Sequence, residues 1–212
     1  MDTTMKNMAP EAVASKKLVI IGVCGARGSF SEEAARAFAA QSDIFEPDFR
    51  YLVTAEAVLT AVEVGDISVG ILPVANSIGG IVIESVYATA GHRYEVEKLF
   101  AIEIHQNILV KKGTRAEQVT QIVSHDQALK QCKGYLARVW PGVELVEYSD
   151  TAKAAEDLAS GVLPPTSAVI ASVAAAEIYD LDIYEASVND LKTNFTTFIA
   201  VTPFTRTDAA HA

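Results

Sequence analysis

Residues 18–38 read LVIIGVCGARGSFSEEAARAF and contain one complete strand-to-helix unit. Residues 18–23 are apolar and rich in β-branched side chains, which predicts a buried strand. The glycines of residues 25–28 predict a turn, and the alanine-rich segment after them predicts a helix. Ser31 is the expected N-cap of this helix, because Glu32 and Glu33 then occupy the first turn, where the helix dipole favours negative charge.

The same pattern recurs along the chain, which is typical of βαβ units with largely parallel sheets. A long strand over residues 100–110 interrupts the pattern, which then restarts, so two similar halves are expected. Residues 73–80 are expected to form a loop before a helix that ends near residue 90. The other predicted strands cover residues 51–53, 69–72, 122–123, 143–146, 168–171 and 198–201, and the other predicted helices cover residues 55–64, 128–139, 152–159 and 173–179.

The composition limits the classes of protein to which this chain can belong. Of its 212 residues, 50% are hydrophobic and 21% are charged, which excludes a disordered chain, and the length allows one core or two half-size lobes. The net charge of −10 without a basic run disfavours nucleic acid as a partner. The longest apolar stretch, residues 18–23, is far shorter than the about 20 residues of a membrane helix.

The N-terminus and the cysteines indicate the compartment. The first sixteen residues contain no apolar segment of the kind found in signal peptides, and they are expected to form a flexible tail. Cys24 and Cys132 lie far apart without a Cys-x-x-Cys spacing, so neither a disulfide framework nor a cysteine-based zinc site is expected. We therefore expect a cytoplasmic protein that handles a small molecule and does not bind a membrane.

Small hydroxyl and amide side chains stand at the predicted strand-to-helix junctions. They are Ser29 and Ser31, Asn76 and Ser77, Ser124, Ser149 to Thr151, and Ser172. Ligands of open α/β sheets bind at the carboxyl ends of strands, where helix N-termini present free backbone N–H groups. A small carboxylate or phosphate ligand would suit such a cleft. The same side chains could serve only as helix caps, and their spacing alone does not name a ligand.

At these junctions the chain resembles the prephenate dehydratase family, across residues 18–201. The matching segments are residues 25–31 (GARGSFS), 70–80 (GILPVANSIGG), 124–132 (SHDQALKQC), 168–181 (AVIASVAAAEIYDL) and 194–198 (NFTTF). They are similar to family motifs that read Gly-Pro-x-Gly-Thr-Phe-Ser, Pro-Ile-Glu-Asn-Ser, Ser-His-Pro-Gln-Ala-x-x-Gln-Cys, Ala-Ile-Ala-Ser…Ala-Glu-x-Tyr-Gly-Leu and Asn-x-Thr-Arg-Phe. All five occur in the family's order.

The resemblance implies a two-lobed α/β fold similar to type II periplasmic binding proteins, with the active site between the lobes. Lobe one would comprise residues 17–104 plus 190–204, and lobe two residues 105–189, with residues 205–212 as a tail. It also implies a homodimer. Family members usually carry a C-terminal regulatory ACT domain, which is not expected here because the sequence stops at Ala212. No metal or other cofactor is implied, and the histidines show no ligand spacing.

The implied reaction converts prephenate to phenylpyruvate with loss of carbon dioxide and the ring hydroxyl. By motif position, Thr196 would hydrogen-bond the leaving hydroxyl, and Asn76, Gln131 and Ser124 would orient the dicarboxylate substrate. Residues expected to bind it are Ser29, Phe30, Ser31, Ser77, His125, Thr151, Ser172 and Phe198. Without the resemblance, Thr196 would read as an ordinary strand residue, Gln131 as helix surface and Asn76 as a turn residue.

Two departures from the family motifs bear on the chemistry. Ala75 stands where the family has Glu, and Thr197 stands where it has Arg; Ala26 and Asp126, both in place of Pro, are milder changes. The two losses could compensate each other if the Glu and Arg pair in relatives. They could also mark a changed substrate or reaction.

Three functional classes therefore remain open. The first is a prephenate dehydratase, with prephenate and its aminated relative arogenate equally compatible. The second is a diverged enzyme on the same scaffold, either a decarboxylase that does not aromatise the ring or a hydrolase that uses Ser124 or Ser77 with His125 or His105. The third is a ligand-binding module without catalytic activity.

Overall fold

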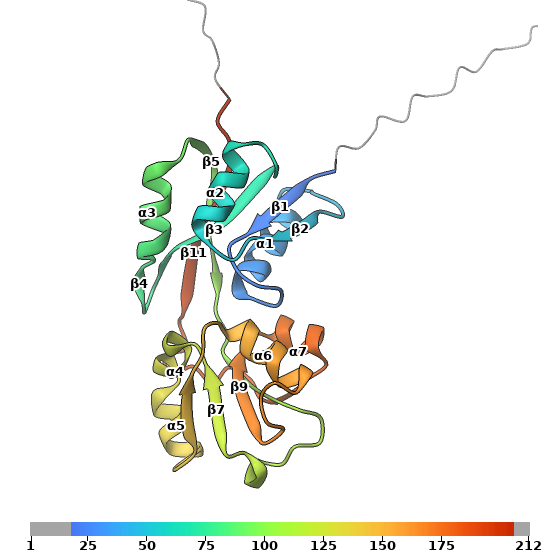
Figure 1. Cartoon of the computed structure of the whole chain (residues 1–212). Coiled ribbons are helices and arrows are strands. Elements are labelled where there is room, and N and C mark those ends of the chain that lie inside the picture. Colours follow the sequence, from blue (N-terminus) through green and yellow to red (C-terminus); the bar gives the residue numbers. More distant parts are fainter. Residues whose placement is uncertain (1–17, 206–212) are drawn as a thin grey trace, which may run out of the picture.

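The computed structural model describes residues 18–205, which form two β-sheets joined by crossing strands and flanked by helices (Figure 1). The predicted tails, residues 1–16 and 205–212, lie outside the described residues apart from Thr205. No helix among residues 18–205 is both long and apolar enough to cross a membrane.

The first sheet has six strands in the order β2-β1-β3-β11-β5, with β4 paired to β3. Its strands are β1 (Ile20–Val23), β2 (Asp48–Tyr51), β3 (Val69–Asn76), β4 (Gly80–Ile81), β5 (Tyr94–Glu103) and β11 (Phe195–Pro203). Strand β1 runs parallel to β2 and β3, whereas β11 runs antiparallel to β3 and β5. The last strand of the chain therefore lies inside the sheet that the first strands begin.

Three helices cover this sheet: α1 (Phe30–Gln41), α2 (Ala55–Glu63) and α3 (Ile83–Gly91). Apolar residues of α1, such as Phe38, pack with Ile21, Ile71 and Phe198 on one face of the sheet. Residues of α2 pack with Leu72 on the other face. The Thr54 side chain accepts a hydrogen bond from the Ala57 N–H and caps α2, as its position before the helix predicts.

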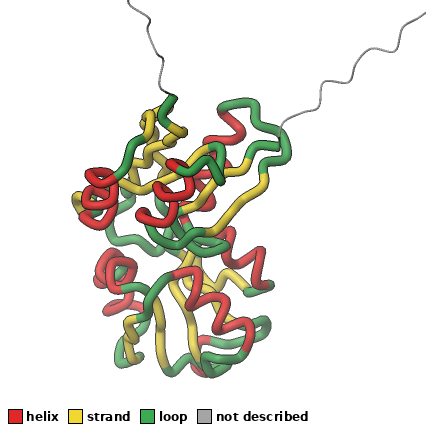
Figure 2. The backbone as a smooth tube through the Cα atoms, turned by 45° about the horizontal axis from the view of Figure 1, so that its top comes forward, coloured by secondary structure: helices red, strands yellow, loops and turns green. Residues whose placement is uncertain are grey.

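The second sheet has five strands in the order β10-β6-β9-β7-β8. Its strands are β6 (Asn107–Val110), β7 (Gln121–Ser124), β8 (Glu144–Glu147), β9 (Ser167–Ala171) and β10 (Asp182–Glu185), and its helices are α4 (Asp126–Gln131), α5 (Lys133–Val139), α6 (Thr151–Ser160), α7 (Val173–Tyr179) and the 3₁₀ helix η1 (Ala116–Gln118). Helices pack on both faces, so each half has the layers of an open α/β unit (Figure 2).

The chain crosses between the two sheets twice. It leaves the first sheet at the end of β5 and enters the second at β6, and it returns between β10 and β11. The first sheet is thus built from residues 20–103 plus 195–203, and the second from residues 107–185. The segments that join the sheets lie side by side, because the Ile104 N–H donates to the Asn194 carbonyl at 2.7 Å.

The expectation of largely parallel sheets is wrong, since β11, β5, β6, β4 and β10 all make antiparallel pairs. The long strand expected over residues 100–110 is also two strands. At Gln106 the backbone N–H donates to the Asn189 side chain and not to a neighbouring strand, because the chain changes sheets there. Of the predicted loop over residues 73–80, only residues 77–79 form a turn; residues 73–76 end β3 and residue 80 begins β4.

Two helix boundaries also differ from the sequence-based expectation. Ser29, and not Ser31, caps α1, because the Ser29 side chain accepts from the Glu32 N–H. The helix expected over residues 128–139 breaks at Cys132 into α4 and α5. The second piece begins where the Asp190 carboxylate accepts from the Gly134 and Tyr135 N–H groups, and this distant partner does not show in the local sequence.

Candidate active site

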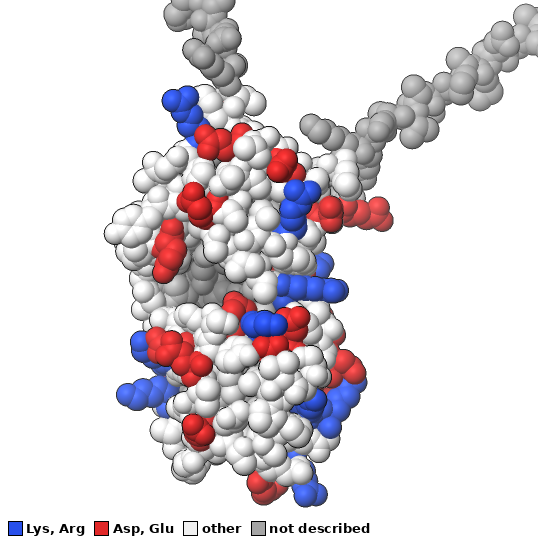
Figure 3. Space-filling model, viewed as in Figure 1, with Lys and Arg blue, Asp and Glu red and all other residues white. Residues whose placement is uncertain are grey.

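A cleft of about 300 Å³ lies between the two sheets. Figure 3 shows a hollow between the two halves whose visible interior is mostly uncharged. Both sheets and their helix starts contribute to its wall. The lining residues are Phe30, Ser31, Pro73, Asn76, Val82, Ile104, Gln106, His125, Gln127, Ala128, Gln131, Ser149, Asp150, Thr151, Thr196 and Phe198. This volume is at the lower end of the range for small-molecule sites.

Asn76, at the end of β3, is held in one orientation by the backbone around it. Its Oδ1 accepts from the N–H groups of Ile78 at 2.9 Å and Gly79 at 2.7 Å. Its Nδ2 therefore faces the other way, toward Asn194 Oδ1 at 2.8 Å, Thr196 Oγ1 at 3.0 Å and the Phe195 carbonyl at 3.2 Å. A reversed amide would set its oxygen against two acceptors, Asn194 Oδ1 and the Phe195 carbonyl, and its N–H groups against those of Ile78 and Gly79.

The hydrogen bonds continue from Asn76 into the other half of the molecule. Asn194 is fully buried, and its Nδ2 donates to Gln131 Oε1 at 3.0 Å. Gln106, which is 4% exposed, donates from Nε2 to the same Gln131 oxygen at 3.1 Å. We call Asn76, Asn194, Gln131 and Gln106 the amide relay. The relay joins the end of β3 and the residue before β11 to the end of α4 and the residue before β6.

The hydrogen bonds of the relay determine which donors and acceptors in the cleft stay available to a ligand. Thr196 Oγ1 accepts from Asn76 and, among residues 18–205, has no second hydrogen-bond partner, so its hydroxyl hydrogen is free to point into the cleft. Gln131 Oε1 accepts two hydrogen bonds, which leaves the N–H donors of the Gln131 amide for a ligand. The wall between the halves thus presents hydrogen-bond donors from both Thr196 and Gln131.

Helix N-termini from both halves also face the cleft. Phe30 and Ser31 begin α1 in the first half, and Thr151 begins α6 in the second, and all three line the cleft. The first N–H groups of a helix have no partner within it, and the helix dipole makes them attractive to anions. His125 Nδ1 accepts from the Gln127 N–H at 3.2 Å at the start of α4, so Nε2 carries the hydrogen of the neutral ring.

Four residues predicted for the site do not line the cleft, because hydrogen bonds hold them elsewhere. Ser124 is fully buried and its hydroxyl donates to the Ile170 carbonyl, and Ser172, which is 1% exposed, donates to the Gly28 carbonyl. Ser29 caps α1, and the Ser77 hydroxyl accepts from the Phe195 N–H. None of these four serines lines the cleft, so none presents a hydroxyl to a ligand there.

The remaining predicted residues come together in the cleft: Thr196, Asn76, Gln131, Phe30, Ser31, His125, Thr151 and Phe198. The prediction missed Gln106, Asn194, Gln127, Ser149 and Asp150 as site residues. Two of these residues could have been found from the sequence, because Asn194 opens a family-like motif and Asp150 directly precedes a predicted helix. Gln106 lies within what reads as one long strand, and only its place between the two sheets brings it to the cleft.

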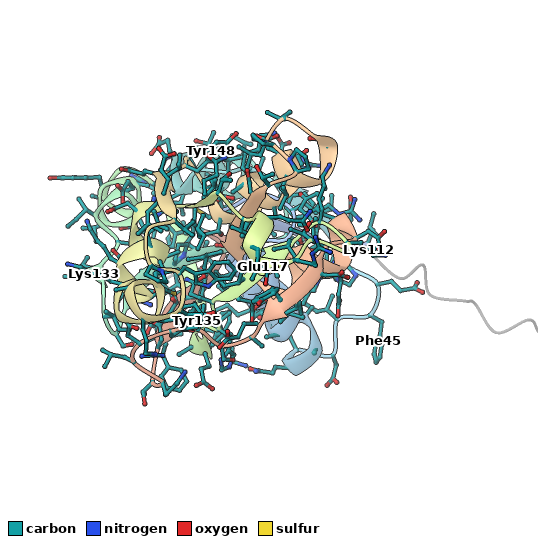
Figure 4. The ribbon with its side chains drawn as sticks, turned by 90° about the horizontal axis from the view of Figure 1, so that it is seen from below. Phe45, Lys112, Glu117, Lys133, Tyr135 and Tyr148 are labelled. Carbon is teal, nitrogen blue, oxygen red and sulfur yellow. The ribbon has the colours of Figure 1, made fainter. Side chains whose placement is uncertain are left out.

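The side chains that line the cleft carry little charge. Among the described residues the lining contains no lysine or arginine, and Asp150 is its one carboxylate. Basic side chains of the second half, such as Lys112 and Lys133, point outward on opposite sides of the molecule (Figure 4). Burial raises the pKa of the Cys132 thiol, which follows Gln131 in the chain, to about 12, so this thiol stays protonated and is a poor nucleophile.

The two departures from the motifs lie directly opposite each other. Thr197 of β11 pairs with Ala75 of β3, and Thr196 pairs with Asn76. Because side chains alternate between the faces of a sheet, Ala75 and Thr197 point to the face opposite Asn76 and Thr196. Neither residue lines the cleft. A Glu and an Arg at these positions would therefore be cross-strand neighbours behind the cleft wall.

The serine–histidine pairs considered for a hydrolase are not formed. The hydroxyls of Ser124 and Ser77 have other partners, and His125 caps α4. His105 contacts Ser187 at 3.3 Å and Glu103 at 3.4 Å, and none of these three lines the cleft. The cleft therefore lacks an activated nucleophile of this type.

Comparisons with known proteins agree with the motifs. The sequence profile described as "Prephenate dehydratase" matches residues 21–204. The arogenate dehydratase/prephenate dehydratase 6 of Arabidopsis thaliana is 33% identical over 201 residues, which cover 92% of this chain and 46% of that protein. The bifunctional chorismate mutase/prephenate dehydratase of Stutzerimonas stutzeri is 29% identical over 196 residues, which cover 92% of this chain and 52% of that protein. The chain thus spans about half the length of these relatives.

A solved structure supports the same relationship at the level of the fold. The prephenate dehydratase of Arthrobacter aurescens, solved with L-Phe, superposes with a TM-score of 0.79 at 21% identity, over 88% of this chain and 61% of that chain. This likeness confirms the expected α/β fold with two sheets. With motifs, profile and fold in agreement, the chain belongs to the prephenate dehydratase family.

Proposed function

We propose that this protein is a dehydratase that removes carbon dioxide and the ring hydroxyl from prephenate or its aminated relative arogenate. The observation that carries the proposal is the hydrogen bond from Asn76 Nδ2 to Thr196 Oγ1. It makes the Thr196 oxygen an acceptor on one side and leaves its hydrogen as a donor toward the cleft. A donor aimed at the leaving hydroxyl is the main help that this reaction needs.

The electrons of the reaction balance without a further reactant. The bond from the ring to its carboxylate breaks, and its electron pair enters the ring as carbon dioxide departs. The carbon–oxygen bond on the opposite side of the ring breaks, and its pair leaves with the hydroxyl oxygen, which takes up a proton to become water. Because a free alcohol is a poor acid, Thr196 stabilises the departing oxygen by a hydrogen bond, and the proton is relayed from solvent.

Two kinds of donor would hold the substrate's two carboxylates. The N-termini of α1 and α6 approach the cleft from opposite halves, at Phe30 and Ser31 on one side and Thr151 on the other. Gln131 N–H and His125 Nε2–H add side-chain donors. This arrangement supports binding of a small dicarboxylate without a basic side chain in the lining.

The missing Glu and Arg of the family motifs do not argue against this chemistry. Their positions, Ala75 and Thr197, pair across the strands on the face away from the cleft. This placement supports a compensating loss of two partners more than a changed reaction. Decarboxylation without aromatisation therefore has no observation in its favour and becomes an outcome of the test below.

The test mixes purified protein with prephenate and with arogenate, and follows phenylpyruvate or phenylalanine together with carbon dioxide. We expect the aromatic product and the gas to appear in equal amounts. Gas without an aromatic product would instead indicate a decarboxylase, and neither product from either substrate would indicate a binding module.

The first prediction concerns the Thr196 hydroxyl. Thr196→Val keeps the shape of the side chain and removes the donor, so kcat should fall about 100-fold, as for other lost donors to a developing oxyanion. Thr197→Val is the matched control, because the neighbouring threonine lies on the opposite face, and it should leave kcat near the wild-type value. Equal turnover by wild-type protein and Thr196→Val would refute the proposed role.

A homodimer stays a prediction that rests on the family resemblance, and a cytoplasmic location stays a prediction that rests on the composition and the cysteine spacing. Size-exclusion chromatography with light scattering measures the first of them directly.

A further inference from the structure

The far end of the amide relay leaves one buried oxygen unpaired. Gln106 is 4% exposed and lines the cleft, and its Oε1 is buried without a hydrogen-bond partner among the described residues. The backbone groups of Gln106 are both satisfied, because the N–H donates to Asn189 Oδ1 and the carbonyl accepts from the Val188 N–H. Oε1 is therefore the one polar atom of Gln106 that has no hydrogen-bond partner among the described residues.

The orientation of the Gln106 amide follows from the relay, step by step. The N–H groups of Ile78 and Gly79 fix Asn76, so its Nδ2 must donate to Asn194. Asn194 must then donate to Gln131 Oε1, and Gln106 can meet that oxygen only with its own N–H group. Reversing the Gln106 amide would set two oxygens against each other. Its Oε1 is thus kept as an acceptor.

A buried acceptor without a donor is costly, and such groups are few in native proteins. Gln106 lines the cleft but its Oε1 is buried, so a donor in the cleft would meet this oxygen after a rotation of the side chain that exposes it. The two carboxylates of the substrate have no hydrogen to donate, and neither has the keto group of prephenate. The ring hydroxyl would accept from Thr196 and keep its own hydrogen, but prephenate and arogenate share this group, so it does not distinguish them. The amino group of arogenate, in contrast, carries three N–H donors and a positive charge.

The charge of the cleft favours the same substrate. Among the described residues its lining has no lysine or arginine and one carboxylate, Asp150, and the whole chain carries a net charge of −10. Prephenate would bring two negative charges into this surrounding. Arogenate carries the same two carboxylates and one ammonium group, so its net charge is half as large. Electrostatic repulsion is therefore smaller for the aminated substrate.

We propose that Gln106 determines specificity by accepting a hydrogen bond from the substrate's ammonium group, so that the protein prefers arogenate to prephenate. This inference rests on the proposed dehydratase function and adds the substrate to it. Gln106 also holds Gln131 through its Nε2, so a useful test must separate the acceptor oxygen from this second contact.

Two variants at the same position make that separation. Gln106→Leu and Gln106→Glu both lose the Nε2 donor to Gln131, but only Glu keeps an acceptor oxygen. The quantity to measure is the ratio of kcat/KM for arogenate to kcat/KM for prephenate, with phenylalanine and phenylpyruvate as the products. Both substrates are assayed on one preparation, so a fraction of misfolded protein cancels in the ratio.

We expect wild-type protein to favour arogenate. Gln106→Leu should lower the ratio by about tenfold or more, as for the loss of a hydrogen bond to a charged group. Gln106→Glu should keep or raise the ratio. Gln121→Leu is the matched control, because it removes an amide whose partner is Ser167 Oγ and which does not line the cleft, and it should leave the ratio unchanged.

The outcomes separate this inference from the proposed function. A wild-type protein that turns over both substrates but favours prephenate would overturn the inference and leave the dehydratase assignment standing. The same holds if Gln106→Leu and Gln106→Glu give equal ratios. Absence of turnover with either substrate would overturn the dehydratase assignment, and the specificity proposal with it.

Discussion

Single residues in this protein take their roles from the partners that orient them. Thr196 is an ordinary strand residue by composition, and it becomes a donor because Asn76 occupies its acceptor side. His125 is held in one tautomer because its Nδ1 caps α4. Ser124, one residue earlier, is removed from chemistry because its hydroxyl donates to the Ile170 carbonyl. At this scale the hydrogen-bond partner decides more than the residue type.

His92 allows a prediction of pH dependence. Its ring nitrogens contact Glu63 at 2.7 Å and Glu56 at 2.9 Å, and hydrogen bonds to these carboxylates raise the pKa of His92 above its usual value. The charged ring is therefore favoured in the folded state. Its contribution to the free energy of unfolding should be complete below the unfolded-state pKa of about 6.5, and it should disappear as pH rises through the raised pKa.

The measurement is urea unfolding of wild-type protein and His92→Gln between pH 5.5 and 9. The difference in unfolding free energy between the two proteins should be largest at the acidic end and shrink toward pH 9. The other histidines are the same in both proteins, so their contributions to the unfolding free energy cancel in this difference. A difference that stays constant over this range would show that His92 does not titrate with folding.

Among the elements, the pair β3 and β11 carries the site. Their register brings Thr196 opposite Asn76. It shifts between Thr197 and Phe198, where β3 has one residue more than β11, so Pro73 and Asn76 both line the cleft although they are three positions apart. Bulges of this kind redirect side chains next to active sites. Because β11 comes from the end of the chain and β3 from its first third, their pairing assembles the site from residues about 120 positions apart.

The face of β3 and β11 that points away from the cleft allows a further prediction. Ala75→Glu together with Thr197→Arg should form a cross-strand ion pair, which stabilises a sheet by about 0.2–1 kcal/mol relative to the unpaired residues. A double-mutant cycle of unfolding free energies measures this coupling, with each single variant as a control. Activity of the double variant should match the wild type, because these side chains point away from the cleft. Loss of both stability and activity in the double variant would contradict the compensating-loss explanation.

At the scale of the whole molecule, the two halves touch at a seam beside the cleft. The Ser172 hydroxyl donates to the Gly28 carbonyl at 2.6 Å, and Tyr179 OH donates to the Arg27 carbonyl at 3.0 Å. The turn before α1 therefore rests directly on α7 of the other half. The amide relay crosses between the halves at a second place. Together these contacts set the width of the cleft.

A substitution at Gly28 tests whether these contacts set the width of the cleft. Its φ is +83°, and an added Cβ would lie 3.1 Å from the Ala175 Cα. Gly28→Ala should therefore push the two halves apart and raise KM several-fold, in addition to the loss of about 1 kcal/mol or more expected from the backbone conformation. Gly65→Ala is the matched control, because Gly65 has φ +76° with nothing within 4 Å of an added Cβ. It should lose similar stability with KM unchanged. Equal KM values for both variants would show that the seam does not set the cleft.

The local part of the fold was predictable from the sequence. The caps Thr54 and Ser172, the strand-to-helix alternation and the turn at residues 25–28 depend on contacts within a few residues, which a sequence pattern records. The same locality explains why the family-like motifs found Asn76, Gln131 and Thr196, since each motif is a short continuous segment: the end of β3, the step from β7 into α4, and the start of β11.

The rest depended on which strands are neighbours, and no local pattern encodes this. The split of residues 100–110 between two sheets, the antiparallel position of β11 and the break at Cys132 all involve partners far away in the chain. Gln106 reaches the cleft, and Asn194 reaches the amide relay, for the same reason. The sequence by itself thus determined the strand-to-helix units and the residue types at their junctions, because caps and turns are short-range. Only the tertiary structure decided which of these side chains meet and which way each amide points, because hydrogen bonds between distant strands set both.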